Sequence, residues 1–143
     1  MAVLTALDLS KYILHKCTVE NKPISNLQLQ KILFFAQKAV LQKYDEPLFN
    51  EELEAWRFGP VSPEVYYKYK GYGSSDILVF EINKKPDANY KKIIDQVVED
   101  KRTKYIWDLV EESHKKDGSW YKIFDMGKGE REIIPKGLIK QYG

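Results

Sequence analysis

The sequence predicts a mainly α-helical, compact multi-helix domain that carries a small β element, an α+β fold at most. Apolar side chains recur at steps of three and four residues along most of the chain, which is the spacing of one helix face. Only one short run, ILVFEI at residues 77–82, has the composition of a β-strand. The length of 143 residues, of which 43% are apolar and 31% charged, suits one domain over residues 1–143.

The first two helices follow from this periodicity and from a break between them. An apolar face over residues 5–17 predicts the first helix, and Pro23 breaks the chain after it. Ser25 begins the second helix, because its side chain can cap a backbone N–H and Gln28 completes a capping box. The apolar band that follows is wider than one stripe, so we expect this helix to be central and mostly buried. The band consists of Leu29, Ile32, Leu33, Phe34, Phe35, Ala36, Val40 and Leu41.

A third helix is expected after an irregular acidic stretch over residues 45–55. The pair Gly59-Pro60 predicts a rigid chain reversal. Ser62 is expected to cap the helix, and Pro63 takes the first helical position, where no N–H is needed. The remaining helices are expected over about 87–98, 103–114 and 120–124 and from Pro135 onward, with residues 127–134 as a loop or a short second strand.

The stretch WRFGPVSPEVYYKYKGYG at residues 56–73 is rich in aromatic side chains. Helical spacing directs Tyr66 and Tyr69 inward beside Val65, and we expect Trp56 and Phe58 in the core as well. The fold does not require the side chains that remain, and tyrosine supplies contact area at low entropic cost. We therefore expect a partner protein to contact Arg57, Tyr67, Lys68 and Tyr72.

The charge balance and the rare residues argue against several classes of protein. A net charge of +2 is too small to predict DNA binding by bulk electrostatics. The single cysteine, Cys17, excludes an intramolecular disulfide and fits a reducing cytosol. No run approaches the ~20 apolar residues that span a bilayer, and no signal-peptide pattern begins the chain. We expect a cytoplasmic protein.

No catalytic or metal-binding pattern stands out. His15 and His114, the two histidines, have no metal-ligand spacing with Cys17, so we expect no metal. Ser113, His114 and Asp117 lie close in sequence, but catalytic triads are assembled from distant segments. We expect neither a catalytic site nor a cofactor. Alternating lysines and tyrosines leave RNA binding open as an alternative, as does an enzyme that uses His114.

Segments in a fixed order resemble the Panacea domain family of phage-associated, GepA-like proteins, which includes SocA-like antitoxins. They are ISNLQLQKILFFAQ at 24–37, EPLFNEELEAWRFGPVSPEVY at 46–66, the SH pair at 113–114 with GSW at 118–120, and the start of the last helix. The residues that match the family pattern, and that we expect to be mostly structural, are Lys31, Trp56, Gly59, Pro60, Val61, Pro63, Tyr66, His114 and Trp120. Leu27, Leu29, Ile32, Leu33 and Val65 also match, whereas Phe34 and Phe35 replace the usual tyrosines and Ser113 replaces the usual threonine.

The resemblance implies a prophage-type antitoxin without enzymatic activity, which neutralises a protein toxin encoded nearby by binding it directly. It also implies an alternative, in which the chain is an adaptor that delivers the toxin to a ClpXP-type protease. Some family members add a separate DNA-binding domain. Because no chain remains for one here, we expect no sequence-specific DNA binding by the protein alone. A homodimer stays open.

Overall fold

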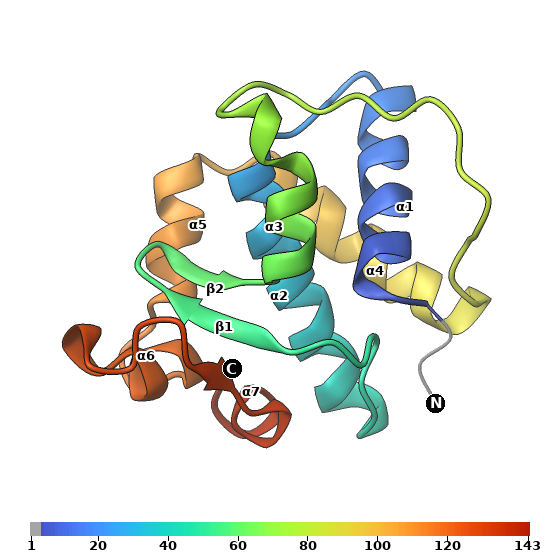
Figure 1. The fold of residues 1–143 in the computed structure, drawn as a ribbon. Coiled ribbons are helices and arrows are strands. Elements are labelled where there is room, and N and C mark those ends of the chain that lie inside the picture. Colours follow the sequence, from blue (N-terminus) through green and yellow to red (C-terminus); the bar gives the residue numbers. More distant parts are fainter. Residues whose placement is uncertain (1–3) are drawn as a thin grey trace.

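The computed structural model describes residues 4–143 as a helical domain with a small antiparallel sheet on one side (Figure 1). The mainly α-helical class predicted from the sequence is confirmed. The helices are α1 (Ala6–Val19), α2 (Asn26–Tyr44), α3 (Pro63–Tyr69), α4 (Ala88–Arg102), α5 (Ile106–Ser113), α6 (Ser119–Phe124) and α7 (Lys136–Tyr142), with 3-10 turns η1 (Lys70–Tyr72) and η2 (Asp125–Gly127). The strands are β1 (Leu53–Trp56), β2 (Gly59–Val61) and β3 (Ile133–Ile134).

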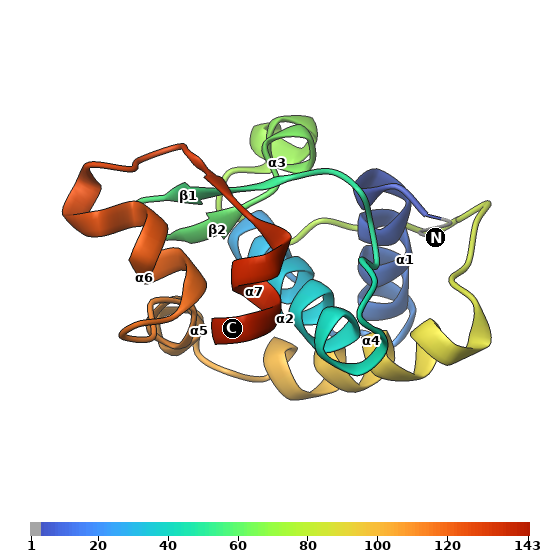
Figure 2. The ribbon, with the colours of Figure 1, turned by 90° about the horizontal axis from the view of Figure 1, so that it is seen from below.

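Helix α2 is the centre of the fold, as its wide apolar band predicts. It packs against α1, α3, α4, α5, α7 and β2, and in the view from below the other helices lie around it (Figure 2). The capping box of Ser25 and Gln28 is confirmed, because each side chain bonds the other residue's backbone N–H. Leu29, Ile32 and Leu33 are fully buried in the resulting core.

Helix α1 buries the predicted face against α2. Ala6, Leu9, Ile13 and Cys17 are all 0% exposed. Thr5 and Asp8 form a capping box at its start.

The segment over residues 77–82 is not a strand, contrary to the prediction. Only Ile77 pairs with another backbone, in an isolated bridge to Ile24. The segment continues past α1, where the backbone N–H of Val79 donates to the Thr18 hydroxyl at 3.1 Å. Among the described residues no strand lies beside this segment, so its inward-facing apolar side chains pack against a helix and the segment does not join a sheet.

The sheet forms where the sequence predicted an irregular segment and a turn. Strand order is β2-β1-β3, and both pairings are antiparallel. Trp56 pairs with Gly59, so the reversal lies at Arg57 and Phe58 and not at Gly59-Pro60. Pro60 fits β2 because this is an edge strand, where a missing N–H breaks no ladder on the open side. The expected short strand near residue 134 is confirmed as β3.

The predicted side-chain cap by Ser62 is absent. Ser62 stands at the N-cap position of α3, but its side chain does not bond the helix backbone. The backbone N–H of Ser62 instead donates to Gln30 Oε1 at 2.8 Å, which fixes the start of α3 against α2. No helix within residues 4–143 combines the length and the apolar character needed to cross a bilayer.

Candidate interaction surface

The β1–β2 hairpin and α3 place a cluster of aromatic rings at the surface. Trp56 at the end of β1 meets Tyr66 edge-on at a centroid distance of 5.0 Å, and Tyr67 lies 6.0 Å from Trp56. Trp56 and Tyr66 are half-buried, whereas Tyr67 is 53% exposed. The prediction that Trp56 and Tyr66 point into the core is therefore only partly right, because each keeps one side open to solvent.

Phe58 is the clear exception to the predicted core. It occupies the hairpin turn, is 47% exposed and packs edge-on against Trp107 of α5 at 5.6 Å. Trp107 is itself 45% exposed. Because the turn begins earlier than the sequence predicts, the Phe58 side chain points toward solvent and extends the aromatic cluster toward α5.

Two arginines lie among these rings. The Arg131 guanidinium lies 4.1 Å from the Trp56 ring and donates to the Tyr67 hydroxyl at 3.3 Å. Arg57 lies over Phe58 at 5.8 Å. Within the described residues neither arginine forms an ion pair. We call this set the aromatic surface: Trp56, Arg57, Phe58, Tyr66, Tyr67, Trp107 and Arg131.

Two hollows open on the aromatic surface. One, of about 250 Å³, lies between the hairpin, α3 and Arg131, and fully buried Gln30 lines its floor. The other, of about 460 Å³, lies between the start of α2 and Trp107. Leu27 lines both hollows, so they are adjacent. A hollow with apolar walls and a few polar groups is a favourable binding pocket for a side chain of a partner protein.

Buried Lys31 supports the hairpin from below. Its side chain is 0% exposed, and Nζ donates to the Pro60 carbonyl oxygen at 2.8 Å. Burial lowers the pKa of Lys31 to about 7. Gly59 has a φ of +118°, and a Cβ there would lie 2.8 Å from Lys31 Nζ and 2.6 Å from Ser113 Oγ. Only glycine therefore lets the hairpin approach α2 and α5 this closely.

His114 and Trp120 form a second support. Their rings stack at 3.6 Å with an interplanar angle of 3°, and Trp120 Nε1 donates to the Trp56 carbonyl oxygen at 2.7 Å. Burial, and then the positive charge on Lys31, lower the pKa of His114 to about 4, against a smaller opposing effect of the Phe58 backbone. The imidazole is therefore neutral near pH 7, and this pair fixes the base of the aromatic surface.

Ser113 and His114 do not form a nucleophile–base pair. Ser113 Oγ donates to the Val110 carbonyl oxygen at 2.8 Å, and His114 Nε2 is buried without a partner among the described residues. A nucleophile needs a hydrogen bond to its base. No group of three or more His, Cys, Asp or Glu side chains suited to a metal occurs within residues 4–143.

The structure divides the predicted partner-binding residues among three places. Arg57 and Tyr67 belong to the aromatic surface. Lys68 faces a separate cavity between α3 and α1. Tyr72 is 46% exposed and lies 6.3 Å from Tyr69, beyond the end of α3. Sequence reasoning missed Phe58, Trp107 and Arg131 as surface residues, and the last two gave no local signal because they join the cluster only through the fold.

The architecture is that of a helical domain whose small hairpin, held from below by Lys31, His114 and Trp120, displays aromatic and basic side chains. Its sequence matches the model of the "Antitoxin SocA-like, Panacea domain" family over residues 29–121. The chain belongs to this family. It is also 43% identical over 72 residues to the protein named Antitoxin SocA from Caulobacter vibrioides. That match covers 50% of this chain and 38% of the relative, so the chain spans well under two thirds of the relative's length. No solved structure matches the fold.

Proposed function

We propose that this protein is an antitoxin that neutralises a cognate protein toxin by binding it directly through the aromatic surface. The single observation that carries the proposal is the exposure of Phe58, Tyr67 and Trp107 together on one face of a member of an antitoxin family. Exposed aromatic side chains next to arginines are the composition of the centres of protein interfaces.

The size of the surface agrees with this role. A standard interface takes about 800 Å² from each partner. This is about a tenth of the 7699 Å² accessible surface of the chain. The candidate patch consists of the hairpin, one side of α3 and the start of α5, and it includes the two hollows. Blocking a toxin sterically requires no chemical step at the antitoxin.

The positive charges of the aromatic surface indicate which side chains the contacting segment of the toxin carries. Arg57 and Arg131 lack ion pairs within the described part of the chain, so both guanidinium groups are available to carboxylates of a partner. Arg131 is fixed by Trp56 and Tyr67, which lowers the entropy lost when it forms a bidentate contact. We therefore expect the toxin's contact segment to carry acidic residues next to an apolar side chain that enters a hollow.

The test removes two exposed rings and measures binding. Purified protein is titrated by calorimetry with the purified product of the open reading frame that abuts its gene. Because the truncation of one hot-spot residue costs about 2 kcal/mol or more, which is about 30-fold in affinity, Phe58→Ala with Tyr67→Ala should weaken binding by up to about 1,000-fold.

The matched control removes one phenylalanine and one tyrosine elsewhere. Phe80 is 70% exposed and Tyr121 is 42% exposed, and both lie off the aromatic surface. Phe80→Ala with Tyr121→Ala should bind as the unaltered protein does. Equal losses in both pairs, or full affinity of a folded Phe58→Ala, Tyr67→Ala variant, would count against this surface.

A further inference from the structure

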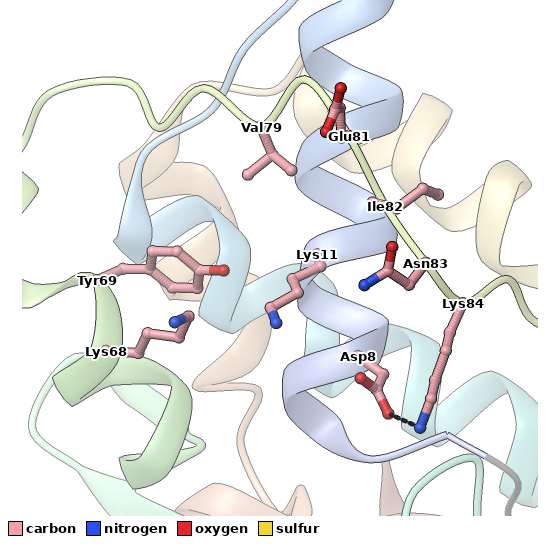
Figure 3. A pocket seen from close by; sticks show the side chains of 9 residues that line it. All are labelled: Asp8, Lys11, Lys68, Tyr69, Val79, Glu81, Ile82, Asn83 and Lys84. Atoms are coloured by element: carbon pink, nitrogen blue, oxygen red, sulfur yellow. Dashed lines mark hydrogen bonds and ion pairs between the residues drawn. The ribbon is translucent and has the colours of Figure 1, made fainter.

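A cavity of about 360 Å³ lies apart from the aromatic surface, between α1, α3 and the segment over residues 79–84 (Figure 3). Its walls come from parts of the chain that are distant in sequence. The segment is held on α1 by the Val79 N–H bond to Thr18 and by an ion pair between Lys84 and Asp8 at 3.4 Å. The hollow is thus part of the folded domain and does not belong to one loop.

The polar groups that enter this cavity are mostly hydrogen-bond donors. The ammonium groups of Lys11 and Lys68 and the hydroxyl of Tyr69 point into the same space, and the Asn83 amide faces it from the segment (Figure 3). Within residues 4–143 neither lysine forms an ion pair; Lys68 lies only over the Tyr69 ring, at 5.7 Å. Burial raises the pKa of Tyr69, so its hydroxyl keeps its proton and can donate.

The acidic residues of the cavity do not neutralise these two lysines. Asp8 is engaged at the start of α1, where it accepts from the Thr5 N–H and pairs with Lys84, each at 3.4 Å. These partners hold the pKa of Asp8 below its usual value in spite of partial burial, which acts to raise it. Glu81 lies at the opposite end of the cavity from Lys68 (Figure 3). Two positive charges are left facing one space.

We propose that this cavity binds a small phosphate monoester, with its phosphate between Lys11 and Lys68. A phosphate carries about two negative charges near pH 7 and several acceptor oxygens, which two ammonium groups, a phenol and an amide can satisfy together. Val79 and Ile82 supply an apolar wall for the organic part of the ligand. The volume lies near the lower end of small-molecule sites, which begin at about 300 Å³. This inference does not rest on the proposed antitoxin function.

The experiment is a binding titration followed by NMR, with inorganic phosphate and glycerol phosphate as probes. Acetate tests whether a carboxylate is enough for binding, and glycerol tests whether the uncharged part of glycerol phosphate is enough. We expect saturable shifts at Lys11, Lys68 and Asn83 with both phosphates. Replacing the pair, Lys11→Met with Lys68→Met, should weaken binding at least about 100-fold, because two charged hydrogen bonds to the phosphate are lost.

The control removes the same charge from two exposed lysines outside the cavity, with Lys22→Met and Lys92→Met. It should bind phosphate as the unaltered protein does. The proposal is overturned if neither phosphate binds saturably, if acetate binds as tightly as phosphate, or if the control pair weakens binding as much as the cavity pair.

Discussion

At the scale of single residues, three of the side chains that match the family pattern lie beneath the aromatic surface and hold the hairpin in place. Lys31 is bonded to the backbone of β2, and His114 stacks on Trp120, which is bonded to the backbone of β1. A buried lysine with one carbonyl partner is costly unless its charge can be lost, which agrees with its pKa of about 7. The aromatic surface depends on these few polar contacts.

His114 predicts a pH dependence of stability. Its pKa is about 4 in the fold, against an ordinary value of 6.5. Between these values the unfolded chain binds a proton that the folded chain does not, so the free energy of unfolding falls as pH falls from 6.5 toward 4. His114→Phe keeps a ring to stack on Trp120 but removes this contribution. Urea unfolding at about pH 7 and pH 4.5 measures the difference.

His15 provides the control for this prediction. His15→Phe should leave the loss of stability on acidification as large as in the unaltered protein, because the effect belongs to His114. Unchanged acid sensitivity in a folded His114→Phe variant would show that the buried imidazole does not couple folding to protonation.

At the scale of elements, the helices were predictable and the sheet was not. Helix α2 could be read from its apolar band and capping box, because both depend on residues close in sequence. The strands are only two to four residues long, and β1 pairs with β3, which is distant in sequence. No local pattern predicts that pairing. The aromatic character of Phe58 predicts a core position, whereas the register of the β1–β2 hairpin places it in the turn. Likewise, Trp107 and Arg131 reach the aromatic surface only through tertiary packing.

Two serines that look alike in sequence test this point. Ser25 accepts from the Gln28 N–H at 3.3 Å, whereas the Ser62 hydroxyl has no partner within the described residues. Ser25→Ala should lower the free energy of unfolding by about 1 kcal/mol, as the loss of an N-cap does. Ser62→Ala should cost much less, because only an unpaired hydroxyl is removed. Chemical denaturation of the two variants compares them, and an equal loss would refute the assignment.

At the scale of the whole molecule, the aromatic surface and the lysine-lined cavity lie at different sides of α3. Tyr67 belongs to the first and Lys68 to the second, so neighbours in sequence serve different places. The sequence indicates that α3 carries exposed side chains. It does not indicate which of them face the aromatic surface and which face the cavity, because that depends on the elements that pack on each side of α3.

The most direct test of the proposed function is a growth assay in a bacterial strain that lacks a ClpXP-type protease. The product of the abutting reading frame is expressed alone and together with this protein. If the protein acts by direct binding, growth stops in the first case and is restored in the second, and the Phe58→Ala, Tyr67→Ala variant fails to restore it. Continued arrest in the presence of the folded, unaltered protein would contradict neutralisation by binding.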